Sequence, residues 1–181
     1  MTGGNRTWFT ADTHFGHGNI IRYCQRPFRD TREMDGAMIS AWNAAVGPDD
    51  TVWHLGDFAF RSARAPMDLL RRLNGIKHLV WGNHDGPDCR AAPGWTSSQP
   101  YAEVSVEGQR LVLFHYACRV WNGCGRGAVQ LYGHSHARLP GSSLSLDVGV
   151  DAWDFRPVGL AEIRRRLRTL PAFVPGDHHG Q

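Results

Sequence analysis

The stretch IKHLVWGNHDG, residues 76–86, joins a run of apolar and β-branched residues to a cluster of polar ones. Residues 76–81 have the composition of a β-strand, and Gly82 allows the chain to turn sharply where that strand ends. Asn83, His84 and Asp85 follow directly. A turn does not need an amide, an imidazole and a carboxylate side by side, so this strand end is a candidate site of chemistry.

Four more predicted strands end in a similar way. They cover residues 7–11, 51–55, 110–114 and 129–132, and they are followed by Asp12-Thr13-His14, Gly56-Asp57, His115 and Gly133-His134-Ser135-His136, respectively. Open α/β sheets bind ligands outside the carboxyl ends of their strands. We therefore expect the side chains at these five strand ends to meet at one edge of the structure.

The remaining pattern predicts the fold class. Asp30 and Glu33 form a capping-box pattern, and Met34, Met38 and Trp42 recur every four residues as the apolar face of a helix. Further helices are predicted over residues 66–73 and 159–168, a hairpin over 102–114 and a last strand over 143–148, whereas 87–101 should be irregular. Strands that first alternate with helices and later pair with each other predict an α/β sandwich with mixed sheets.

Length and composition limit the possible classes of protein. The 181 residues are most economically one domain, residues 1–181, and the net charge of +3 is too small to indicate nucleic-acid binding by itself. No apolar run approaches the roughly 20 residues of a membrane span, and the N-terminus lacks the pattern of a secretory signal. The four cysteines show no C-x-x-C spacing. We therefore expect a cytoplasmic protein with reduced thiols, no membrane association and no obligate protein partner.

The side chains at the strand ends have the chemistry of metal ligands. Carboxylates and imidazoles without thiolates suit Mn²⁺, Fe or Zn²⁺. One ion rarely needs so many ligands, whereas two ions that share a carboxylate would use them economically. Pairs of ions about 3.5–4 Å apart are common in enzymes that cleave phosphate esters.

The ordered series D-x-H, G-D, G-N-H-D, H and G-H-x-H, from Asp12 to His136, resembles the calcineurin-like metallophosphoesterase superfamily. The flanking stretches TADTHFGHGNII, HLGDFAF and DVGVDAW are similar to those of its small single-domain bacterial and phage phosphoesterases. The resemblance implies a β-sandwich of two mixed sheets flanked by helices, with a metal site at the C-terminal strand ends. No insertion is long enough for a cap domain.

The resemblance also implies a role for each residue of the site. One metal would be held by Asp12, His14, Asp57 and His136, and the other by Asp57, Asn83, His115 and His134, with Asp57 bridging the two. His84 would not be a ligand but would stabilise the transition state or protonate the leaving oxygen. Asp85 would fix the tautomer and the orientation of the His84 imidazole.

Alternative interpretations stay open for residues around this set. His17 and Asn19 either contact substrate or form the turn before a helix. Arg22 and Arg26 either bind a substrate phosphate or belong to a solvated loop. Arg119 either lines the pocket or lies in a surface loop stiffened by Trp121.

These observations predict a phosphodiesterase that uses two divalent metals, with Mn²⁺ as first choice, and a metal-bridging hydroxide as nucleophile. The substrate would be a phosphate ester such as a nucleotide or a nucleic acid. The first alternative is a phosphomonoesterase acting on nucleotides or phosphoproteins. The second is a nucleic-acid-binding module whose metals are structural, although such sites usually contain thiolates.

Overall fold

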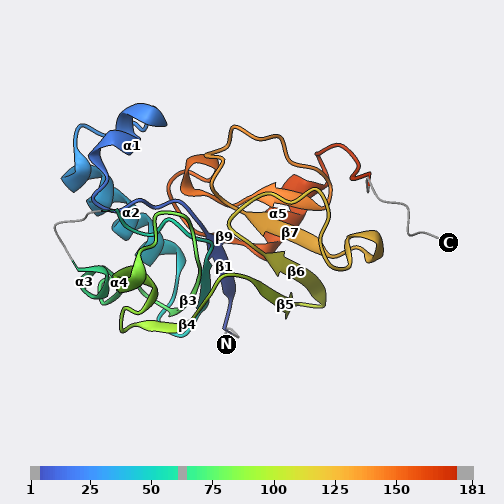
Figure 1. Cartoon of the computed structure of the whole chain (residues 1–181), viewed down its shortest axis with the longest axis horizontal. Coiled ribbons are helices and arrows are strands. Elements are labelled where there is room, and N and C mark those ends of the chain that lie inside the picture. The colour runs from blue at the N-terminus through green and yellow to red at the C-terminus, as the bar shows by residue number, and fades with distance from the viewer. Residues whose placement is uncertain (1–4, 61–64, 175–181) are drawn as a thin grey trace.

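The computed structural model describes residues 5–60 and 65–174, and these ranges form two mixed β-sheets with helices beside them (Figure 1). The first sheet consists of β1 (Thr7–Thr10), β2 (Thr51–His54), β3 (Ile76–Val80), β4 (Trp95–Gln99) and β9 (Val158–Gly159). The second consists of β5 (Ala102–Val106), β6 (Gln109–Leu113), β7 (Val129–Tyr132) and β8 (Ser145–Asp147). The helices are α1 (Gly18–Tyr23), α2 (Thr31–Ala45), α3 (Pro66–Leu70), α4 (Pro87–Arg90) and α5 (Leu160–Leu167), with 3₁₀ turns at Cys124–Arg126 and Val150–Ala152.

The direction of the strands places the carboxyl ends that precede the polar clusters at common edges of the sheets. The first sheet has the order β4-β3-β2-β1-β9, in which β1 to β4 are parallel and β9 is antiparallel to β1. The second has the order β5-β6-β7-β8, with β5 antiparallel to β6 and with β6, β7 and β8 parallel. The carboxyl ends of β1, β2 and β3 therefore lie at one edge of the first sheet, and those of β6, β7 and β8 at one edge of the second.

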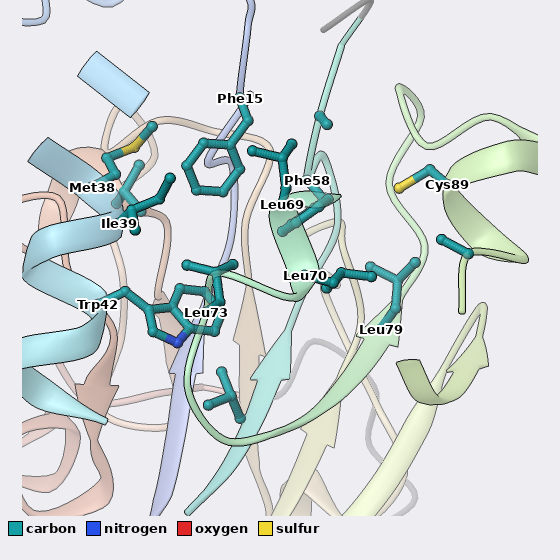
Figure 2. Close-up of a cluster of buried hydrophobic side chains, with 14 of the residues drawn as sticks. Phe15, Met38, Ile39, Trp42, Phe58, Leu69, Leu70, Leu73, Leu79 and Cys89 are labelled. Carbon is teal, nitrogen blue, oxygen red and sulfur yellow. The ribbon is translucent and has the colours of Figure 1, made fainter. Parts of the chain in front are cut away.

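The first sheet is buried on both faces because successive side chains of a strand point to opposite sides. Leu79 of β3 packs on α2 and α3, whereas its neighbour Val80 packs on Leu113 and Leu131 of the second sheet. Figure 2 shows the helical side, where Trp42 of α2 lies near Leu73, and Leu70 of α3 lies near Leu79. One apolar layer thus joins helices to sheet and another joins the two sheets.

The fold class predicted from the sequence is confirmed, and several local predictions hold. The Asp30 carboxylate caps α2 by accepting the backbone N–H of Glu33 at 2.8 Å. The hairpin of β5 and β6 turns at Glu107 and Gly108, as the sequence indicates.

The segment predicted to be irregular, residues 87–101, instead contains α4 and β4. β4 is an edge strand with little buried apolar surface, and its serines bond to neighbouring side chains: Ser97 to His78 at 2.7 Å and Ser98 to Trp81 at 2.8 Å. An edge strand held by polar contacts has no hydrophobic alternation to detect. The helix that begins at Pro66 also ends at Leu70, earlier than the predicted Leu73.

Across residues 5–60 and 65–174, every helix is too short or too polar to cross a membrane.

Candidate metal centre

The predicted ligands gather in two neighbouring groups. Asp12, His14 and His136 offer ligand atoms within 4.8 Å of one another, and so do Asp57, His115 and His134. The first group joins the ends of β1 and β7, and the second joins the ends of β2, β6 and β7. Residues up to 124 positions apart in the chain therefore meet at one edge, as the strand-end pattern predicted.

Asp57 lies between the two groups. Its Oδ2 is 3.5 Å from Nε2 of His14 and 3.5 Å from Nε2 of His115. Its Oδ1 accepts the backbone N–H of His84 at 2.8 Å. Burial favours the protonated acid, but the hydrogen bond and charge of His115, with His14 and the His84 amide, hold the pKa of Asp57 below its usual range. One carboxylate oxygen thus faces an imidazole of each group.

Asn83 completes the second group. Its carboxamide Oδ1 lies 3.1 Å from Nε2 of His115 and 3.5 Å from the hydroxyl of Tyr116. Nδ1 of His115 lies 2.7 Å from the carbonyl oxygen of Leu55, which can only accept a hydrogen bond. Nδ1 therefore carries the proton, and Nε2 is the atom that faces the centre.

The residues fit a divalent metal. Nε2 of His14 is buried and has no hydrogen-bond partner in the described part of the chain. Burial lowers the pKa of His14 to about 2, so its imidazole is neutral and presents a lone pair. Burial also raises the pKa of Asp12 to about 7, and a cation in contact would favour its charged form. Buried polar atoms are normally satisfied, and a metal ion would satisfy Nε2 of His14.

The backbone of the centre is unusual. Five predicted ligand residues have positive φ: Asp12, His14, Asp57, His134 and His136, between 48° and 65°. Two glycines of the motifs are required by close packing. A Cβ at Gly82 would lie 2.2 Å from Oδ1 of Asp57, and one at Gly133 would lie 2.7 Å from Oδ2 of Asp12. At these two strand ends the glycine allows the neighbouring loops to touch.

His84 lies next to the two groups but belongs to neither of them. Its Nε2 is 4.0 Å from Oδ2 of Asp57, and its side chain is 36% exposed. The ring packs edge-on against Phe60 and His14, with centroids 5.0 Å and 5.3 Å apart. The imidazole can therefore reach a group bound at the centre from solvent.

Asp85 does not have the predicted role. Its carboxylate accepts the backbone N–H groups of Gly82 at 2.8 Å, Asp57 at 2.9 Å and Phe58 at 2.9 Å, and it is 1% exposed. The expected hydrogen bond to the His84 imidazole is wrong, because the tight turn directs the Asp85 side chain underneath the loop. Asp85 instead ties the loop after β3 to the loop after β2.

Arg26 neither binds substrate nor belongs to a solvated loop, so both interpretations of this residue are corrected. Its guanidinium donates to both oxygens of Asp151 at 2.8 Å and to the carbonyl oxygens of Asp12 at 2.7 Å and Thr13 at 3.1 Å. A contact to the sulfur of Met34 uses the remaining N–H. Arg26 is 4% exposed and supports the first ligand loop from inside.

Asp151 is a residue of the centre that the sequence pattern did not single out, although it lies in the DVGVDAW stretch. Its Oδ2 is 2.8 Å from Nδ1 of His136. Burial favours the neutral imidazole, but the bond to Asp151, together with Cys24 and Asp12, raises the pKa of His136 to about 10. Asp151 holds the proton on Nδ1 and leaves Nε2 to face Asp12 and His14.

Asp151→Asn should weaken Mn²⁺ binding about 10–100-fold, because the partner that orients a ligand imidazole is lost. Isothermal titration calorimetry of the metal-free protein measures this. Asp154→Asn is the matched control, since Asp154 is exposed in the same segment. Equal Mn²⁺ affinity for the wild-type protein and the folded Asp151→Asn variant would contradict the orienting role.

Of the other candidates, His17 and Asn19 lie at the centre. They line a cavity of about 530 Å³ with His14, His84 and His136, which we call the polar cavity. Nδ1 of His17 is 3.4 Å from Nδ1 of His14. Their substrate role stays a prediction, since His17 is also the N-cap of α1.

Arg22 and Arg119 are exposed and are absent from the described lining of the polar cavity. Beside Arg119, the buried Trp121 donates its indole N–H to the carbonyl of Ala128 at 2.8 Å, which favours the stiffened surface loop. A different arginine, Arg138, lines the cavity and donates to the carbonyl of Tyr23. The sequence places Arg138 two residues after His136, but this spacing does not show that its side chain points into the cavity.

Comparisons with known proteins identify the family of this chain. A family model described as a calcineurin-like phosphoesterase superfamily domain matches residues 7–146, a range that contains all seven predicted ligands. An uncharacterized protein of Methanocaldococcus jannaschii is 29% identical over 164 residues, which cover 86% of this chain and 87% of that protein. The gene 66 protein of Mycobacterium phage L5 is 29% identical over 183 residues, covering 82% and 88%.

One solved structure has the same fold over nearly the whole chain. A protein of unknown function from Aquifex aeolicus superposes with a TM-score of 0.70 at 22% identity, covering 90% of this chain and 100% of that one.

Proposed function

Because the chain belongs to the calcineurin-like phosphoesterase superfamily and is a metal-dependent phosphoesterase, we propose that it hydrolyses phosphodiesters with two divalent transition-metal ions. The observation that carries this proposal is the position of Asp57, whose Oδ2 is 3.5 Å from an imidazole nitrogen of each ligand group. Asp12, His14, Asp57 and His136 would hold one ion. Asp57, Asn83, His115 and His134 would hold the other.

When bound, such ions neutralise phosphate charge and supply a nucleophile by lowering the pKa of water. The chain itself supplies the proton donor. His84 has an exposed ring 4.0 Å from Asp57, so a phosphate at the centre lies within its reach. Its imidazole would donate a proton to the leaving oxygen or a hydrogen bond to a phosphoryl oxygen. Asp85 would act by positioning the loops.

The proposed preference for diesters rests on the accessibility of the metal centre. We propose one domain, residues 1–181, without a cap, and an uncovered centre accepts a phosphate that carries a group on each side. A phosphomonoesterase acting on nucleotides or phosphoproteins is the second candidate, because Arg138 in the polar cavity suits additional negative charge. The match to a phosphoesterase domain favours an enzyme over a nucleic-acid-binding module with structural metals.

We propose Mn²⁺ as the native metal, with Fe or Zn²⁺ as the alternatives, because imidazole ligands favour transition metals over Mg²⁺. A cytoplasmic location is in keeping with four free cysteines.

Metal removal tests the proposal. Exhaustive chelation should abolish hydrolysis of bis(p-nitrophenyl) phosphate, and two equivalents of Mn²⁺ per chain should restore it better than Mg²⁺. Turnover of p-nitrophenyl phosphate should be slower than that of the diester. Undiminished activity after metal loss confirmed by elemental analysis would disprove the metal mechanism, and faster turnover of the monoester would assign the second candidate instead.

A further inference from the structure

A second cavity of about 620 Å³ borders the polar cavity. It lies between α3, α4 and the residues Ala59 and Phe60 after β2, and its lining also includes Met67, His84, Pro87 and Ala92. We call it the apolar groove. His84 and Phe60 line both cavities, so the two spaces meet at this pair of rings.

The two cavities differ in the polar groups that they present. Among the described residues that line the apolar groove, most are alanine, proline, methionine or phenylalanine, and Asp88 is the only carboxylate. The polar cavity presents Arg138, His17 and Asn19 instead. A carboxylate at an otherwise apolar wall disfavours a second anionic group there and leaves burial of apolar surface as the source of affinity.

The groove has the size and rigidity of a binding site. Ligand pockets commonly measure about 300–1,000 Å³ and are mostly apolar with few polar groups. Pro66 and Pro87 stand at the first turns of α3 and α4, where their fixed φ stiffens both walls. A preformed wall loses little entropy when a ligand binds.

Position relates the groove to the reaction. A phosphate in contact with His84 would lie where the two cavities meet, so its two ester groups would extend in different directions. We propose that the apolar groove binds an alkyl or aryl ester group of a phosphodiester, while the polar cavity takes the group on the other side of the phosphorus. This inference rests on the proposed diester hydrolysis and adds that the substrate is apolar on one side.

Inhibition constants test the inference on the Mn²⁺-loaded enzyme. Hexyl methyl phosphate should compete with bis(p-nitrophenyl) phosphate at least about 10-fold better than dimethyl phosphate, because a single buried methylene is already worth about that factor. 5-Carboxypentyl methyl phosphate, of similar length but anionic at its end, should lose most of this gain.

Met67→Asp should bring the ratio of the hexyl and dimethyl inhibition constants close to one, because it places a charge in the groove. Val120→Asp is the matched control, since Val120 is 42% exposed and lines neither cavity, and it should keep the wild-type ratio. Equal inhibition by the hexyl and dimethyl esters, or an unchanged ratio in Met67→Asp, would overturn the inference.

A second measurement does not depend on metal or turnover. In metal-free protein labelled with ¹³C-methyl methionine, hexyl methyl phosphate should shift the Met67 signal, identified by its loss in Met67→Leu. Met34 and Met38, at most 2% exposed, are internal controls and should not move. If the Mn²⁺-loaded enzyme does not hydrolyse bis(p-nitrophenyl) phosphate but the Met67 signal shifts, the proposed function is wrong and the groove assignment is supported. If bis(p-nitrophenyl) phosphate is hydrolysed but the Met67 signal does not shift, only the groove assignment is wrong.

Discussion

Asp57→Asn should lose bound metal and nearly all turnover together, at least about 10²–10³-fold in kcat, the cost of a single charge-stabilising group in other enzymes. The substitution removes the negative charge that both ligand groups share. Oδ2 of Asp57 is 3.5 Å from both His14 and His115, so no other described carboxylate is placed to replace it in both groups.

Elemental analysis and steady-state kinetics on the same preparation measure both losses, with circular dichroism to establish that the variant is folded. Asp49→Asn is the control, because Asp49 is exposed in the loop before β2, at the opposite end of the strand. An Asp57→Asn protein with full metal content and near-normal activity would eliminate the two-metal assignment.

His84→Gln should separate turnover from metal binding. We expect kcat to fall about 10²–10⁴-fold, the usual range for a positioned acid or base. Metal content should remain, because the contact of His84 with Asp57 Oδ1 is made by the backbone N–H and survives the substitution. His78→Gln, in the strand that leads to His84, should keep the wild-type kcat, since His78 bonds Ser97 away from the centre.

The leaving group distinguishes two roles of His84. If it protonates the leaving oxygen, the defect should shrink for nitrophenolate, which departs without a proton. If it stabilises charge on the transition state, the defect should be the same for all esters. Loss of a metal ion from crystals of His84→Gln, or an unchanged kcat on every ester, would show that the assigned role is mistaken.

The sequence was sufficient to predict that these side chains meet, because parallel strands carry their carboxyl ends to a common edge. Asp12, Asp57 and His115 each follow a recognisable strand, so order along the chain translated into proximity. The mixed sheets could also be predicted, because early strands alternate with helices and later strands pair as hairpins. This prediction does not require the direction of any side chain.

Side-chain direction within loops was beyond this reasoning. Asp85 is next to His84 in sequence, yet its carboxylate turns toward three backbone amides. Arg26 follows a helix among polar residues, yet it folds inward because Asp151, 125 positions later, balances its charge. Neither partner can be inferred from spacing, because both depend on how distant loops close over one another.

The left-handed backbone at five predicted ligand positions has a consequence for the evolution of relatives; these are Asp12, His14, Asp57, His134 and His136. Residues with a Cβ lose roughly 1 kcal/mol or more in this conformation, and glycine does not. In the mechanism that we propose, selection for catalysis therefore maintains these side chains at a cost in stability. In a descendant released from that selection, these five positions are where glycine would be gained with the least harm to the fold, which would mark a lineage that has given up hydrolysis.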